Sequence, residues 1–315
     1  MKTPIALIVF NRPDTTQKVF NSIREAKPSK LFVIADGPRS NHPGELEKCL
    51  AARAVIDQVD WDCEVFKRYS DVNLGCALAP SQGISWVFDQ VEEAIILEDD
   101  CVPSPSFFPY CEELLEKYCF DERVMHIAGN NPCYRKHSLA HSYAFSRYTL
   151  SWGWATWKRA WQYYDFSMKL WPEVCHSGFL EDVLLDKNAI TSWKRILQIA
   201  YDKKIDAWDY QWTFTCWLQN GLSIIPETNL VTNIGFGVDA THTSTNSQYL
   251  DLSAEAINFP LKHPSCIMRD RQLDYLIERT VFDYNPPIQR KLLKKLRSLM
   301  MECQVQLGYQ PQPEL

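Results

Sequence analysis

The stretch Glu93-Ala94-Ile95-Ile96-Leu97-Glu98-Asp99-Asp100 decides how the rest of the chain is read. Four apolar residues run directly into three consecutive acids. A short apolar run bounded by polar residues predicts a strand that is buried on both faces. The acids then lie at the carboxyl end of the strand, where open α/β sheets bind their ligands. Adjacent carboxylates repel one another, so the cluster predicts either a hard divalent cation or a solvated acidic turn.

The residues before this stretch alternate between strand and helix patterns. Such alternation predicts a mostly parallel α/β sheet with helices on both faces. Thr15 or Thr16 is expected to cap the first helix. The expected strands cover residues 5–10, 31–35, 63–66 and 94–97, and the expected helices start near residues 15, 45 and 75.

Polar residues follow three of the expected strands and should gather at one edge of the sheet. They are Asn11 and Arg12, then Asp36, then the acids 98–100. The Gly-rich turns that bind dinucleotides or triphosphates are absent from the sequence, so phosphates there would need another counter-charge. Arg12 and a metal on the acids would supply it, and Asp36 could accept a hydrogen bond from a base edge. These parts predict a site for a nucleoside diphosphate held through Mn²⁺ or Mg²⁺.

The composition excludes several classes of protein. The 315 residues carry a net charge of −6, so the basic footprint of a nucleic-acid binder is missing. No stretch is long enough to span a membrane, and the first apolar run is too short for a signal peptide. The eleven cysteines include no Cys-x-x-Cys pair. This pattern argues against a zinc site or a disulfide framework and favours the cytoplasm.

The second half of the chain is rich in tryptophan, with nine of the eleven lying between Trp152 and Trp217. Trp152 and Trp154 flank Gly153, and two interpretations stand for them: a wall that packs on sugar faces, or a hydrophobic core. Asn130 follows a short expected strand, where its amide would bond sugar hydroxyls or cap a turn.

At Leu97-Glu98-Asp99-Asp100, followed by Val102-Pro103-Ser104-Pro105, the sequence resembles the metal motif of GT-A-fold glycosyltransferases. The closest resemblance is to the N-acetylglucosaminyltransferase I type, whose metal motif is Glu-Asp-Asp. The strand end at Phe10-Asn11-Arg12 and the one at Asp36 also look like nucleotide-binding ends of that family. The resemblance covers roughly residues 4–245.

The resemblance implies a role for each of these residues. Asp100 would ligate the metal, Glu98 and Asp99 would approach the ribose or a metal-bound water, Asp36 would meet uracil, and Arg12 would meet a phosphate. His242, in a loop rich in Gly and Thr, would close on the diphosphate or the metal, although a lone His is more often structural. One departure is that no basic residue follows the Asn73-Leu74-Gly75 turn, where relatives often carry one.

Asp209 stands at the expected start of a helix, where an acid is commonly an N-cap. The resemblance instead implies the catalytic base of an inverting enzyme, which takes the acceptor proton. Asp206 is the nearest rival for that role.

These observations predict a GT-A catalytic domain over 1–250, with a nucleotide half near 1–103 and an acceptor half near 104–250. The predicted function is metal-dependent, inverting transfer from a nucleotide sugar, by resemblance a UDP-sugar, to a glycan or lipid-linked hydroxyl. A sugar-1-phosphate nucleotidylyltransferase and a non-catalytic sugar-binding module are the alternatives. Residues 251–315 form a C-terminal extension, in which 288–301 predicts a basic amphipathic helix. This helix would contact the inner face of a bacterial membrane, as fits surface-polysaccharide synthesis, or pack on its own domain.

Overall fold

The computed structural model describes residues 1–184, 186–235 and 252–282. Its centre is an eight-stranded sheet with a second, two-stranded ribbon of β5 (Cys101–Pro103) and β10 (Val231–Asn233). In spatial order the large sheet consists of β3 (Glu64–Tyr69), β2 (Lys30–Ala35), β1 (Ile5–Val9), β4 (Glu93–Glu98), β8 (Trp154–Trp157), β6 (Val124–Ala128), β9 (Leu222–Pro226) and β7 (Tyr143–Ser146).

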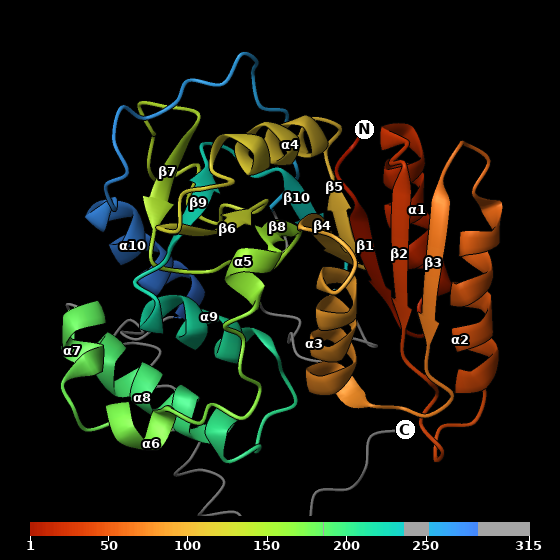
Figure 1. The fold of residues 1–315 in the computed structure, drawn as a ribbon, viewed down its shortest axis with the longest axis horizontal. Helices are drawn as coiled ribbons and strands as arrows, with labels where there is room; N and C mark the ends of the chain where they lie inside the picture. The colour runs from red at the N-terminus through yellow and green to blue at the C-terminus, as the bar shows by residue number, and fades with distance from the viewer. Residues whose placement is uncertain (185, 236–251, 283–315) are drawn as a thin grey trace, which may run out of the picture.

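The first four strands in this order are all parallel, and so are β6 and β9. Strand β8 runs antiparallel to both β4 and β6, and β7 runs antiparallel to β9. Figure 1 shows the parallel strands β1–β3 on one side and the mixed part of the sheet on the other. The predicted fold class, a mostly parallel α/β sheet covered by helices, is therefore confirmed.

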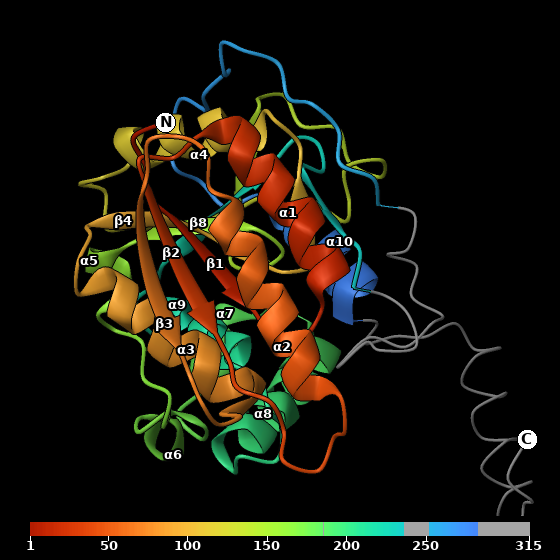
Figure 2. The ribbon, with the colours of Figure 1, turned by 90° about the vertical axis from the view of Figure 1, so that its right-hand side faces the viewer.

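Helices cover both faces of the sheet. One core packs the side chains on one face of β1 and β2 against α1 (Pro13–Ala26), the 3₁₀ turn η1 (Val55–Gln58) and α4 (Phe107–Lys117). The opposite core packs the alternate side chains of these strands against α3 (Gly75–Phe88), α5 (Lys158–Trp161) and α9 (Asp209–Leu218). Helix α2 (Glu45–Ala54) lies beside α1 (Figure 2). The remaining elements are α6 (Trp171–Val174), α7 (Phe179–Val183), α8 (Lys187–Tyr201), α10 (Arg271–Ile277) and η2 (Glu278–Phe282).

The acid-tipped stretch forms β4, an interior strand of the sheet. Ala94 to Leu97 are completely buried. Burial of each of the three larger side chains contributes about 1.5–3 kcal/mol relative to exposure. The parallel register pairs Leu7 with Leu97 and Ile8 with Glu98. The acids therefore begin where β1 also ends, as the sequence predicts.

The predicted cap of the first helix is wrong. Helix α1 begins at Pro13, and its N-cap Arg12 makes no side-chain capping bond. The Thr15 and Thr16 hydroxyls instead donate to the carbonyl of Arg12, at 3.2 and 2.7 Å. Proline suits the first helical position because the N–H it lacks would be unpaired there anyway.

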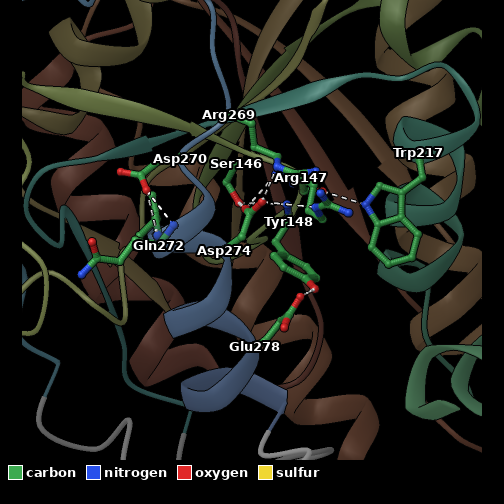
Figure 3. A network of polar contacts seen from close by, with 10 residues as sticks. Ser146, Arg147, Tyr148, Trp217, Arg269, Asp270, Gln272, Asp274 and Glu278 are labelled. Atoms are coloured by element: carbon green, nitrogen blue, oxygen red, sulfur yellow. Dashed lines mark hydrogen bonds and ion pairs between the residues drawn. The ribbon is translucent and has the colours of Figure 1, made fainter. Parts of the chain in front are cut away.

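Residues 252–282 are fastened to the sheet through a buried carboxylate (Figure 3). Asp274 of α10 accepts hydrogen bonds from Ser146 Oγ at 2.7 Å and from Arg147 N and Nε at 3.1 and 3.2 Å, and it forms an ion pair with Arg269, whose Nε lies 3.0 Å away. Burial raises the pKa of Asp274, while its hydrogen bonds and the charge of Arg147 oppose that rise. Tyr148 adds a bond to Glu278. The described part of the predicted extension is thus tied to strand β7.

The proposed amphipathic helix at 288–301 lies outside the described residues. Within the described ranges, no helix combines the length and apolar character that crossing a membrane requires.

Candidate functional site

A cavity of about 850 Å³ opens at the carboxyl ends of β1, β2 and β4. The start of α3, Trp152 and the loop that leads into α9 complete its lining. Most of the site residues predicted from the sequence meet here. The cavity is lined by Phe10, Asn11, Arg12, Asp36, Glu98, Asp99, Asp100, Trp152 and Asp209.

The acid cluster at the end of β4 is held by β1. Asp99 is buried, and its Oδ2 accepts a hydrogen bond from Phe10 N at 3.0 Å. Arg12 Nη1 lies 2.9 Å from Asp100 Oδ2 and 3.9 Å from Asp99 Oδ1. Burial, followed by the charges of neighbouring acids, raises the pKa of both Glu98 and Asp99. One guanidinium therefore offsets only part of the repulsion among three carboxyl groups.

These residues fit a hard divalent cation that arrives together with phosphates. Carboxylate oxygens suit Mg²⁺ and Mn²⁺, and Mg²⁺ is usually held by one or two carboxylates plus substrate phosphates. The described residues contain no ready-made group of three His, Cys, Asp or Glu ligands. Gly235 passes so close to Asp100 that an added Cβ would lie 2.0 Å from its Oδ2. His242, the other predicted metal contact, lies outside the described residues.

Asp36 organises the turn that precedes α3. Its Oδ1 accepts from Gly37 N and Leu74 N, each at 2.8 Å, and its Oδ2 accepts from Asn73 Nδ2 at 2.9 Å and Gly75 N at 3.0 Å. A carboxylate offers about four acceptor positions, so these donors fill them. Burial raises the pKa of Asp36, and the backbone bonds oppose it. A hydrogen bond from Asp36 to a base, as the resemblance implies, would have to displace one of these donors.

Glu45 anchors the end of β1, a role that sequence reasoning missed. The buried carboxylate accepts from Asn11 Nδ2 at 2.9 Å and from Arg39 N at 2.6 Å. Hydrogen bonds from the Arg39 guanidinium, above all, lower the pKa of Glu45 to about 2. Arg39 also lies over the Phe10 ring, 5.6 Å from its centroid. An acid in the first turn of α2 is visible in the sequence, but its partners 6 and 34 residues away are not.

The two candidate bases differ in their surroundings. Asp209 is the first residue of α9 and lines the cavity, and its Oδ1 accepts from Tyr210 N at 3.1 Å. Its charge contributes to the raised pKa of Glu98, so the two carboxyl groups are neighbours. Asp206 instead accepts from Cys76 N at 2.9 Å and Ala77 N at 2.7 Å. Both oxygens of Asp206 are thus engaged by the start of α3.

A buried histidine holds α9 against the cavity wall. Trp212 Nε1 donates to His126 Nδ1 at 3.1 Å, so the ring proton lies on Nε2, which donates to the Leu150 carbonyl at 3.0 Å. Burial lowers the pKa of His126 to about 3, and the ring is therefore neutral. This chain of bonds joins α9 to the residues just before Trp152.

The two tryptophans of the predicted sugar wall lie in different surroundings. Trp152 is half-buried and lines the cavity. Trp154 is completely buried and stacks on His126 and Trp208, with ring centroids 4.9 and 5.4 Å apart. The assignment of Trp154 to a sugar wall is therefore corrected: its ring belongs to the core.

Gly153 and Asn130 lie behind the cavity and are absent from its lining. Gly153 has φ +63°, and an added Cβ would lie 2.8 Å from Val231. Its carbonyl accepts from Gly129 N at 2.7 Å. Asn130 is buried, and its Oδ1 finds no hydrogen-bond partner among the described residues. The bond between Gly129 and Gly153 fixes the loop that follows Trp152.

No protein-family profile and no curated protein matches this chain. Similar solved structures include a galactosyltransferase in complex with donor and acceptor sugar analogues, at 12% identity and TM-score 0.34, covering 58% of this chain and 66% of that one. A 4-diphosphocytidyl-2C-methyl-D-erythritol synthase from Anaerococcus prevotii gives 8% identity, TM-score 0.31, and coverages of 50% and 72%. A UDP-glucose pyrophosphorylase complexed with UDP-glucose is 10% identical with a TM-score of 0.28, and the match covers 48% of this chain and 65% of that one. The chain thus spans slightly less than two thirds of the first and third of these structures.

Proposed function

We propose that this chain is a GT-A-type glycosyltransferase that transfers a sugar from a UDP-sugar to a hydroxyl of a glycan or glycolipid, with inversion at the anomeric carbon. The observation that carries the proposal is the meeting of two chemistries in one cavity. The Arg12–Asp100 pair can receive a diphosphate and its cation. Asp209, which lines the same cavity near Glu98, supplies a carboxylate for proton transfer.

The donor side of the cavity is built from the ends of the parallel strands. Arg12 would meet a phosphate, and the strand end at Phe10 and Asn11 would hold the nucleoside, braced by Glu45. Asp100, with Glu98 and Asp99 beside it, would hold Mn²⁺ or Mg²⁺. Such a cation, when bound, acts as a Lewis acid on the phosphoryl oxygens and offsets the charge of the leaving diphosphate.

The acceptor side would use Asp209 and Trp152. Asp209 would take the proton of the attacking hydroxyl, the task of a general base in an inverting transfer. The exposed part of Trp152 would pack on the apolar face of a sugar. Asp206 is the weaker candidate for the base because its two oxygens already accept backbone hydrogen bonds.

The start of α3 argues against the rival nucleotidylyltransferase. The first N–H groups of a helix are an anion site that a nucleoside triphosphate could use. Here Asp206 occupies the N–H groups of Cys76 and Ala77. An additional phosphate at this position would meet a carboxylate.

Asp209→Asn tests the proposal, because it keeps the shape of the side chain and removes the base. We expect transfer from a UDP-sugar in Mn²⁺ to fall on the order of 10²–10⁴-fold, with donor affinity unchanged. Asp202→Asn is the matched control, since Asp202 is an exposed acid whose carboxylate accepts from the side chains of Gln198 and Lys204. Near-parental turnover in Asp209→Asn would reject Asp209 as the base. A parent that neither transfers nor hydrolyses any nucleotide sugar would reject the proposed function.

A further inference from the structure

Two carboxylates divide the start of α3 between them. The backbone N–H groups of Leu74 and Gly75 donate to Asp36, at 2.8 and 3.0 Å. The next two N–H groups, of Cys76 and Ala77, donate to Asp206, at 2.9 and 2.7 Å. Four consecutive backbone amides therefore donate to two acids, Asp36 and Asp206, that lie 170 positions apart in the sequence.

The two acids come from different elements that line the cavity. Asp36 follows β2, whereas Asp206 lies in the loop before α9. The start of α3 thus joins the end of β2 to that loop through these two acids. Asp206 stands three residues before Asp209.

The residues between Asp206 and Asp209 are rigidly packed. Ala207 and Trp208 are both buried. The Trp208 ring stacks on Trp154, and its carbonyl accepts from Tyr164 Oη at 3.2 Å. A displacement of Asp206 relative to α3 would therefore be passed on to the first turn of α9.

The close approach of Asp206 to the start of α3 requires glycine at position 75. Its φ of +87° lies in the region that favours glycine. An added Cβ would also lie 2.7 Å from Asp206 Oδ2. Only a residue without a side chain lets the carboxylate reach the N–H groups beyond it.

We propose that Asp206 is a positioning residue, which docks the loop carrying Asp209 onto α3 and so sets the distance between the base and the donor. This inference rests on the function proposed above. A reacting group displaced by about 1 Å can lose on the order of 10²-fold in rate. The contact does not touch the Arg12–Asp100 pair, so it should affect turnover and leave donor binding alone.

Paired substitutions distinguish positioning from direct proton transfer. Asp206→Asn keeps one oxygen acceptor, whereas Asp206→Ala keeps none. Positioning predicts a graded loss of kcat, roughly 3–10-fold for Asn and roughly 30–100-fold for Ala, with the donor KM within about 2-fold of the parent. Asp202→Asn, the control in the same segment, should leave kcat unchanged. If Asn and Ala are both as inactive as Asp209→Asn, Asp206 is the base and the positioning role is wrong; parental kcat in Asp206→Ala also overturns it.

Amide hydrogen exchange tests the docking without turnover. Exchange at Cys76 and Ala77 should quicken in Asp206→Ala and remain parental in Asp202→Asn, because only the former removes their acceptor. Unchanged exchange at these amides overturns the inference even if the parent transfers no sugar, so its failure is separable from that of the proposed function. Should Asp206→Ala fail to fold, Asp206→Asn, which retains one bond, decides by the same two measurements.

Discussion

Replacing Arg12 by methionine should change two affinities in opposite directions. Arg12 Nη1 lies 2.9 Å from Asp100 Oδ2, and the two side chains are only 19% and 13% exposed. A cation held by Asp100 would be repelled by the guanidinium, and the size of this repulsion can be estimated for charges about 5 Å apart. With an effective dielectric constant between about 80 and 20, the repulsion amounts to about 1–3 kcal/mol per unit charge. Arg12→Met, which keeps the length of the stem, should therefore raise Mn²⁺ affinity at least about 5-fold in the absence of nucleotide.

The same substitution removes a charged donor to the diphosphate. Hydrogen bonds to charged groups contribute about 1.5–3 kcal/mol, so UDP affinity in saturating Mn²⁺ should fall roughly 10–150-fold. Titration of free Mn²⁺ by electron paramagnetic resonance, followed by calorimetric titration of UDP, measures both quantities. Arg24→Met is the control, because Arg24 lies on the same helix and pairs with the exposed Asp60. If Arg12→Met weakens Mn²⁺ binding, or leaves UDP affinity unchanged, the reasoning about this pair is refuted.

Three further outcomes concern stability, each measured by urea unfolding. The pKa of Glu45 is lowered to about 2, mainly by Arg39, so the carboxylate contributes its full stabilisation above the unfolded pKa near 4.5 and loses it as pH falls toward 2. Glu45→Gln should remove this pH dependence of the free energy of unfolding. It should cost about 1 kcal/mol at pH 7, because Arg39 is 45% exposed and solvent weakens the pair. Asp274→Ala should cost about 3–5 kcal/mol by leaving the buried Arg147 guanidinium without its carboxylate partner, and a loss under 1 kcal/mol would contradict that account. Trp212→Phe should cost about 1–3 kcal/mol because His126 Nδ1 loses its donor, and an unchanged midpoint would show that the bond is dispensable.

The parallel part of the sheet could be predicted because its signals are local. An apolar run such as 94–97, followed by acids, marks a buried strand and the sheet edge on which its acids fall. The parallel register that brings Asp36, Arg12 and Asp100 to one cavity then follows from chain order alone. The mixed part of the sheet could not be predicted in the same way. Its strands β7 and β8 have four residues each and pair with partners distant in the sequence.

The finer geometry of the site depends on contacts that leave no pattern in the sequence. Asp206 and Cys76 are 130 residues apart, and nothing near either residue predicts their bond. Trp152 and Trp154 have almost the same neighbours in the chain, yet the turn at Gly153, whose φ is +63°, leaves Trp152 at the cavity while Trp154 begins β8 and lies in the core. Local composition cannot make that distinction, because both positions are equally apolar.

Metal-dependent binding of a uridine nucleotide tests the central claim most directly. We expect UDP with Mn²⁺ to raise the melting temperature of the parent, and UDP with a chelator to raise it much less, because a ligand that binds only the folded state stabilises it by mass action. In Asp100→Ala the melting temperature without ligand should stay near that of the parent, and the Mn²⁺-dependent part of the shift should vanish. A parent that responds equally to UDP with Mn²⁺ and with chelator, or an Asp100→Ala variant that keeps the Mn²⁺-dependent shift, would contradict the account.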